Sequence, residues 1–265
     1  MPAPLDPSRT IPVTVLTGFL GAGKTTLLNH LLKQPAMADA AVLINEFGEV
    51  GIDHHLVDKI DDNVVLLDSG CLCCSVRGDL TRSLRDLFMK RLRREIPAFS
   101  RVLIETTGLA DPAPVIYTLM EDFFIAERYR SDGVVTAVDV THADAQLARH
   151  PEASKQIAMA DRLLLTKCDL ATSEQVDEIV RRITPLNPGA PRIEVRNGAV
   201  DAAALAGNGL YDPATKTADV RRWLAEEAVR AAAANGHPHA HAHDPDRHDA
   251  RVHSFVLRFA QPFVW

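Results

Sequence analysis

The sequence lacks the features that mark membrane-spanning, secreted or fibrous proteins. No apolar run reaches the roughly 18 residues that a membrane-spanning helix requires, since the best stretch, residues 11–22, is interrupted by Gly18 and Gly21. The first ten residues show no basic segment followed by an apolar one, so we expect no secretory signal. Hydrophobic residues at 46% and charged residues at 24% exclude a disordered, collagen-like or coiled-coil chain.

Cysteine is also scarce, and the chain has no excess of positive charge. Four cysteines in 265 residues are too few for a disulfide framework, and three of them fall within residues 71–74. The formal net charge of −6 argues against broad binding of nucleic acid, which requires a basic surface. We therefore expect a soluble cytoplasmic protein that binds neither nucleic acid nor a membrane.

Short β-branched and apolar segments alternate with longer helical patterns along most of the chain, which is typical of βαβ units. Several of the expected strands are apolar throughout, as in strands that helices cover on both faces. The pattern predicts an α/β fold with a mainly parallel β-sheet and helices on both faces. Strands are expected at Ile11–Thr17, Ala41–Asn45, Val64–Leu67, Val102–Glu105, Val134–Val138, Arg162–Thr166 and Arg192–Val195. Helices are expected at Thr25–Leu32, Leu80–Arg94, Pro114–Met120, Ala143–Ala148, Glu174–Ile183 and Ala218–Ala234.

The composition changes abruptly after residue 236. Residues 237–253 contain six of the eleven histidines and show no apolar periodicity, which indicates a flexible linker. The apolar residues that follow read as a strand, either the first of a mostly absent second domain or one that pairs on an edge of the main sheet. We therefore divide the chain into a main domain (1–236), a His-rich linker (237–252) and an opening strand (253–265).

A phosphate-loop motif, G-x-x-x-x-G-K-[ST], is present in full at Gly18–Thr25, between an expected strand and an expected helix. Its glycines allow backbone N–H groups to enclose phosphate oxygens at the start of the helix. The lysine would neutralise the β- and γ-phosphates, and the Thr25 hydroxyl would ligate Mg²⁺. The motif predicts a P-loop NTPase fold. The expected phosphate ligands are Gly18, Gly21, Ala22, Gly23, Lys24, Thr25 and Thr26.

A later strand ends in Thr166, Lys167, Cys168 and Asp169, a variant of the N-K-x-D guanine motif. The Asp169 carboxylate can accept from N1–H and N2–H₂ of guanine together, a pair that adenine does not offer. The stem of Lys167 can lie over the purine plane. The alternative is an ordinary strand end with a helix-capping aspartate, which would leave an ATP-using phosphotransferase open.

The expected strand at Val102–Glu105 ends in the sequence E-x-x-G. Its carboxylate, Glu105, would hold Mg²⁺ directly or through water, and the N–H of Gly108 would sense the γ-phosphate. We therefore expect Lys24, Glu105 and Gly108 to be the catalytic residues, with water as the nucleophile.

Three thiols this close together suggest a soft metal such as Zn²⁺. Cys71 and Cys73 face the same way in an extended segment, and Cys74 joins them if the chain turns. Glu49 is the candidate additional ligand. Inert buried cysteines and a redox switch are the alternatives.

The His-rich segment offers further imidazoles for Zn²⁺, Ni²⁺ or Co²⁺, a solvated spacer being the alternative. These auxiliary candidates are His237, His239, His241 and His243.

Taken together, five motifs resemble the CobW-type metal-trafficking GTPases, and the stretch around Ser131–Ala171 is most similar to the YjiA-like branch. The motifs are GFLGAGKTT (18–26), NEFGEVGID (45–53), GCLCC (70–74), ETTGLADP (105–112) and TKCD (166–169). The resemblance covers roughly residues 10–200 and implies a GTPase domain whose nucleotide state is coupled to a Zn²⁺ or Co²⁺ site. It also implies that a smaller C-terminal domain follows the His-rich linker, with residues 253–265 as its opening strand. Some members place an acidic metal ligand where this sequence has Ile44, which leaves Glu49 with the cysteines.

The sequence thus predicts a GTP-hydrolysing metallochaperone that delivers Zn²⁺ or Co²⁺ to a metalloprotein client, with GTP and metal changing each other's affinity. A non-enzymatic metal sensor or store with a structural nucleotide is the alternative, and a homodimer is left open.

Overall fold

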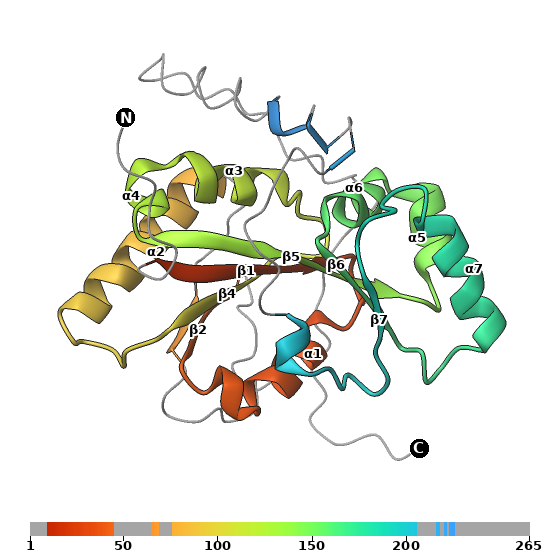
Figure 1. The fold of residues 1–265 in the computed structure, drawn as a ribbon, viewed down its shortest axis with the longest axis horizontal. Helices are drawn as coiled ribbons and strands as arrows, with labels where there is room; N and C mark the ends of the chain where they lie inside the picture. Colours follow the sequence, from red (N-terminus) through yellow and green to blue (C-terminus); the bar gives the residue numbers. More distant parts are fainter. Residues whose placement is uncertain are drawn as a thin grey trace, which may run out of the picture.

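A parallel β-sheet of seven strands organises the part of the chain that the structure describes (Figure 1). The computed structural model describes residues 10–44, 65–68, 76–205, 216–217, 220–221 and 223–225. The strand order is β3-β2-β4-β1-β5-β6-β7, and every pair is parallel. The strands are β1 (Ile11–Gly18), β2 (Ala40–Ile44), β3 (Val65–Asp68), β4 (Arg101–Glu105), β5 (Tyr129–Asp139), β6 (Arg162–Thr166) and β7 (Arg192–Glu194).

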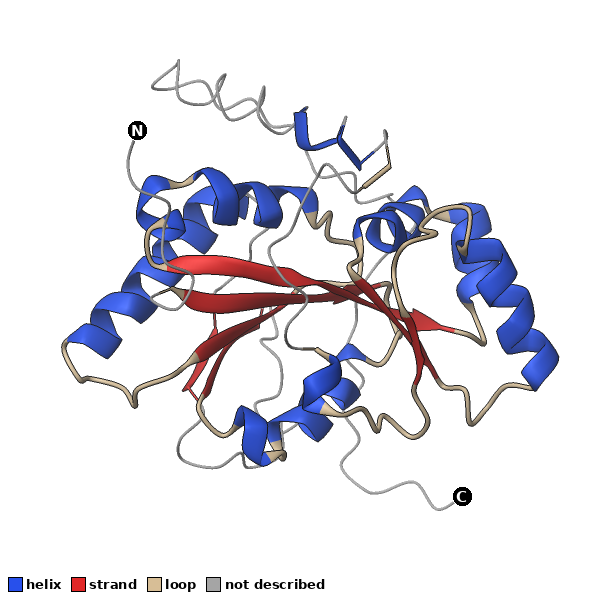
Figure 2. Cartoon of the chain, in the orientation of Figure 1, coloured by secondary structure: helices blue, strands red, loops and turns tan. Residues whose placement is uncertain are grey.

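Helices cover both faces of this sheet, so the predicted P-loop NTPase type of α/β fold is confirmed (Figures 1 and 2). Figure 1 shows α2, α3, α4 and α6 on one side and α1 on the other. The helices are α1 (Lys24–Leu32), α2 (Val76–Leu92), α3 (Ala113–Glu121), α4 (Phe123–Ala126), α5 (Ala143–Arg149), α6 (Pro151–Met159) and α7 (Ser173–Ile183). Short 3-10 turns lie at Pro35–Met37 and Ala202–Ala204.

The core is divided between the two faces by the alternation of side chains along each strand. In β1, Val13 and Val15 pack in one cluster with leucines of α2 and α3, whereas Leu16 packs in the opposite cluster with leucines of α1. In β4, Ile104 and Leu103 divide in the same way. A third cluster joins β5 and β6 to α7. Because both faces are covered, several strands carry apolar residues on both faces, as in β2 (AAVLI), which agrees with the sequence pattern.

Several elements differ from the expected ones, among them the short helix α4, which was not expected. The strand β5 begins five residues early, at Tyr129, because its polar first residues pair with the start of β1. Helix α2 begins at Val76, four residues before the expected start, and ends at Leu92, two residues before the expected end; Arg94 adopts a left-handed backbone (φ 59°). Helix α6 was not expected at all; it starts at Pro151, and proline is well suited to a first helical position.

Other predictions fall on residues outside the described ones. Within the expected helix Ala218–Ala234, residues 220–221 and 223–225 are helical, and the remainder lies outside the described residues. The same holds for the end of the main domain, the linker (237–252) and the opening strand (253–265). In the described part of the chain, no helix has the length and apolarity to cross a membrane.

Candidate functional site

The phosphate loop joins β1 to α1 and has the conformation its glycines permit. Gly21 and Gly23 have positive φ angles of 74° and 85°, and α1 begins immediately afterwards at Lys24. The Lys24 ammonium donates to the carbonyl of Gly18 at 3.0 Å and to that of Phe19 at 3.4 Å. The loop thus places a positive charge beside the N-terminal peptide groups of a helix, an arrangement that binds phosphate.

Thr25 and Glu105 meet beside this loop, although they are 80 residues apart. The Thr25 hydroxyl donates to Oε1 of Glu105 at 3.3 Å, and Glu105 is only 3% exposed. This contact arises because β4 lies next to β1, with Leu16 and Glu105 in register. A hydroxyl and a carboxylate are hard oxygen donors of the kind that Mg²⁺ takes together with phosphate oxygens. The two side chains therefore fit the ion.

The segment after Glu105 is fastened to the phosphate loop. The Thr106 N–H donates to the carbonyl of Leu16 at 3.0 Å, and the Thr106 hydroxyl donates to the hydroxyl oxygen of Thr17 at 2.8 Å. Gly108 packs so closely on Leu20 that a Cβ at this position would lie 2.5 Å from the Leu20 nitrogen. The Gly108 peptide is therefore in direct contact with the phosphate loop.

The T-K-x-D residues also reach this region. The Thr166 hydroxyl donates to the carbonyl of Ala22 at 2.8 Å, which ties the end of β6 to the phosphate loop. Lys167 pairs with Asp139 at 2.8 Å. Asp169 is exposed and accepts from the backbone N–H of Asn197 at 2.9 Å.

Three features of this region were missed in the sequence. Asp139 ends an apolar strand, as Glu105 does, and that position was a usable signal. The turn at Arg196–Ala199 contains the dipeptide Asn197-Gly198, which is typical of tight turns and was equally readable. Gln156, which donates to the carbonyls of Gly108 and Ala110, gave no signal because α6 itself was not expected.

The expected soft-metal ligands Glu49, Cys71, Cys73 and Cys74, and the auxiliary His237, His239, His241 and His243, lie outside the described residues. Among the described residues, no group of three or more His, Cys, Asp or Glu is placed to hold a metal ion.

The strands that flank the predicted metal-binding segments are nevertheless described. Ile44, the last residue of β2, is in register with Glu105 on one side and with Asp68 of β3 on the other. The segments carrying Glu49 and the cysteines therefore leave the sheet one and two strands away from Glu105.

The fold and site define a nucleotide-binding domain of the P-loop type, and the comparison with known families agrees. Residues 12–194 match the family described as CobW/HypB/UreG, nucleotide-binding domain, and the chain belongs to this family. The resemblance stated from the motifs is thereby confirmed.

Individual relatives include the zinc chaperone YjiA of Escherichia coli, which is 42% identical over 195 residues (74% of this chain and 60% of the relative). Zinc-regulated GTPase metalloprotein activator 1 of Schizosaccharomyces pombe is 35% identical over 204 residues, with coverage of 74% and 48%. A crystal structure of Zn(II)-bound YjiA GTPase from E. coli superimposes with a TM-score of 0.60 at 35% identity, with coverage of 77% and 63%. The chain thus spans between about half and two thirds of the length of these relatives.

Proposed function

We propose that this chain hydrolyses GTP to GDP and phosphate, and that it uses the reaction to deliver Zn²⁺ or Co²⁺ to a client metalloprotein. The observation that carries the proposal is the convergence of two other sequence motifs, E-x-x-G and T-K-x-D, on the phosphate loop. Thr25 contacts Glu105, Gly108 packs on Leu20, and Thr166 bonds Ala22. The names of the relatives, a zinc chaperone and a zinc-regulated GTPase metalloprotein activator, support the metal and the nucleotide.

In this proposal, the phosphate loop binds the triphosphate through Gly18, Gly21, Ala22, Gly23, Lys24, Thr25 and Thr26. The Lys24 ammonium offsets charge on the β- and γ-phosphates. Thr25 and Glu105 hold Mg²⁺, which when bound neutralises charge on the phosphates. The Gly108 segment faces the γ-phosphate and orients the attacking water, whose oxygen bonds to phosphorus as the bridging bond to GDP breaks.

The guanine base would lie at the other end of the site. The Asp169 carboxylate accepts from N1–H and N2–H₂, the Lys167 stem covers the purine plane, and Thr166 links β6 to the phosphate loop. The backbone N–H of Asn197 holds one oxygen of Asp169 in place.

The transferred metal would bind Cys71, Cys73 and Cys74 together with Glu49, assisted by the histidines of the linker. The register of Ile44 with Glu105 and Asp68 supports a link between this metal and the nucleotide. A metal that draws the two segments together would restrain the C-terminal ends of β2 and β3, beside the Mg²⁺ ligand. Linkage then requires that metal and GTP change each other's affinity by the same factor.

Phosphate release from GTP, measured with Lys24→Ala and Asp169→Ala variants, tests the hydrolase. Both variants should lose most of the activity, and wild-type turnover in both would contradict the assignment.

Asp169→Asn sharpens the test of the base. Xanthine has a carbonyl where guanine has its amino group, and the asparagine amide can donate to this carbonyl. The variant should therefore prefer xanthosine triphosphate to GTP. Effective competition by ATP in the wild type would instead favour an ATP-using enzyme.

The metal is tested by calorimetric titration of Zn²⁺ and Co²⁺ into the wild type and a Cys71/Cys73/Cys74→Ser variant. Tight metal binding should be lost in the variant. In the wild type, the metal affinity should differ between the GDP form and a form loaded with a non-hydrolysable GTP analogue. Equal affinity in the two forms would contradict the coupling. Bound GTP that is never hydrolysed, even with metal present, would favour a non-enzymatic metal store.

A further inference from the structure

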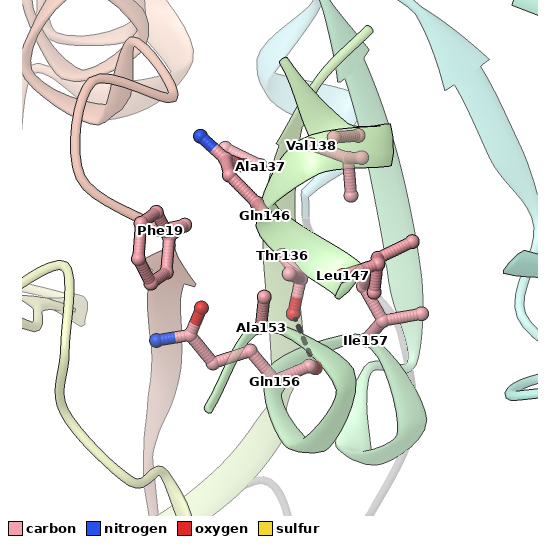
Figure 3. A pocket seen from close by; sticks show the side chains of 10 residues that line it. Phe19, Thr136, Ala137, Val138, Gln146, Leu147, Ala153, Gln156 and Ile157 are labelled. Atoms are coloured by element: carbon pink, nitrogen blue, oxygen red, sulfur yellow. Dashed lines mark hydrogen bonds between the residues drawn. The ribbon is translucent and has the colours of Figure 1, made fainter. Parts of the chain in front are cut away.

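Gln156 is buried in α6 behind the phosphate loop and is only 1% exposed. Its Nε2 donates to the carbonyl oxygen of Gly108 at 3.2 Å and to that of Ala110 at 3.0 Å. Figure 3 shows its side chain reaching from the helix towards the ring of Phe19. Both hydrogens of the amide are therefore used on the short segment that follows Glu105.

The orientation of this amide is fixed by its surroundings. The backbone carbonyl of Gln156 accepts from the Thr136 hydroxyl at 2.9 Å, which ties this turn of α6 to β5 (Figure 3). Its Oε1 is buried and accepts no hydrogen bond from the described residues. Turning the amide over would set that oxygen against two carbonyl oxygens. The amide thus keeps both donors on the segment although its oxygen has no partner among the described residues, and buried polar atoms without a partner are uncommon in native proteins.

The neighbouring residue fastens the far end of the same segment. Lys155 pairs with Asp111, and the other oxygen of Asp111 accepts from the backbone N–H of Ala113 at the start of α3. The near end is held at Gly108, which has no room to move closer to Leu20. One turn of α6 therefore holds the segment at both of its ends, with Gly108 in contact with the phosphate loop.

We propose that Gln156 is a positioning residue for GTP hydrolysis, which acts by holding the Gly108–Ala110 segment in its place beside the γ-phosphate. This inference rests on the proposed function. The segment would face the γ-phosphate and not the α- and β-phosphates. Loss of the Gln156 bonds should therefore lower turnover and GTP binding while leaving GDP binding intact.

The test compares Gln156→Met with Gln146→Met. Methionine keeps the length and the apolar stem of glutamine but removes its N–H donors. Gln146 lines the same small hollow from α5 and, among the described residues, makes no side-chain hydrogen bond to the Gly108–Ala110 segment (Figure 3). A displaced reacting group lowers rates by roughly 10- to 100-fold, and we expect a fall of kcat in this range for Gln156→Met. The affinity for GDP should stay within about twofold of wild type, and Gln146→Met should match wild type in both.

Unchanged kcat in Gln156→Met would overturn the inference, and so would a parallel loss of affinity for GDP and GTP, which would indicate a merely structural role. Gln156→Asn provides a second variant in case the first does not fold; its amide is one methylene too short to reach both carbonyls, so the same pattern should appear in weaker form. If the wild type releases no phosphate, the proposed function fails. The affinity for a non-hydrolysable GTP analogue relative to GDP then still tests Gln156, and an unaltered ratio overturns its role.

Discussion

The Lys167 ammonium lies 2.8 Å from Oδ2 of Asp139, which is the last residue of β5 and is 2% exposed. Thr141 donates to the other oxygen through its backbone N–H at 2.9 Å and its hydroxyl at 2.6 Å. Burial alone would raise the pKa of Asp139, but the hydrogen bonds from Lys167 and Thr141 outweigh it and hold the pKa below its ordinary value of 3.8. A buried carboxylate thus fixes the lysine that is proposed to cover the guanine base.

Replacing Asp139 with asparagine should weaken the binding of GTP and GDP to a similar extent. The amide cannot attract the ammonium as the carboxylate does, and loss of a charged hydrogen bond of about 1.5 kcal/mol or more predicts at least a tenfold loss of affinity. Titration with fluorescent nucleotides measures this. Asp144→Asn is the control, because Asp144 is exposed and pairs with Arg182 on the surface. A change in kcat without a change in affinity would contradict the prediction.

The same carboxylate should contribute to stability in a pH-dependent way. Because its pKa is lowered in the folded protein, the contribution is fully present above the unfolded value of 3.8 and is lost as the pH falls through the folded value. The free energy of unfolding should therefore differ between wild type and Asp139→Asn at pH 7, and the difference should shrink below about pH 4. Urea unfolding at several pH values checks this. A difference that grows on acidification would contradict it.

Gly108→Ala should impair hydrolysis by pushing the segment away from the phosphate loop. The new methyl group would lie 2.5 Å from the Leu20 nitrogen, so the backbone of one segment must move. A shift of this kind predicts roughly a 100-fold loss of turnover, measured as phosphate release at saturating GTP. Gly189→Ala is the matched control, since a Cβ there would meet nothing within 4 Å. Equal activity of both variants would show that contact at Gly108 does not matter.

Trp223 should report the state of the Gly108–Ala110 segment. The ammonium of Lys155 lies 5.1 Å from the centre of the Trp223 ring and also pairs with Asp111 at the end of this segment. A movement of the segment should thus change the indole environment. In a Trp265→Phe background, exchange of GDP for a non-hydrolysable GTP analogue should alter the emission, and Lys155→Met should abolish the response. A response of wild-type size in Lys155→Met would exclude this route.

The features that could be predicted from the sequence are those that depend on neighbouring residues. Gly21, Gly23 and Lys24 lie within four consecutive residues, so the spacing of the motif was sufficient to locate the phosphate loop. Thr166 and Asp169 were likewise recognised as a contiguous group at a strand end. The role of Gln156 could not be predicted from the sequence, because its partners Gly108 and Ala110 are 46 to 48 residues away along the chain. Its helix, which begins at a proline after a short interruption, was not expected either.

The amino-acid sequence by itself determined the class of fold and the position of the glycine-rich phosphate-loop motif, since apolar strands and a glycine-rich turn are local consequences of backbone sterics and side-chain type. Only the tertiary structure decided which distant groups share a site. The insertion of β4 between β2 and β1 sets Glu105 beside Leu16 on one side and Ile44 on the other, and the packing of α6 brings Gln156 to Gly108. Strand order and helix packing depend on burying the apolar faces of the whole sheet together, which no short stretch of sequence specifies.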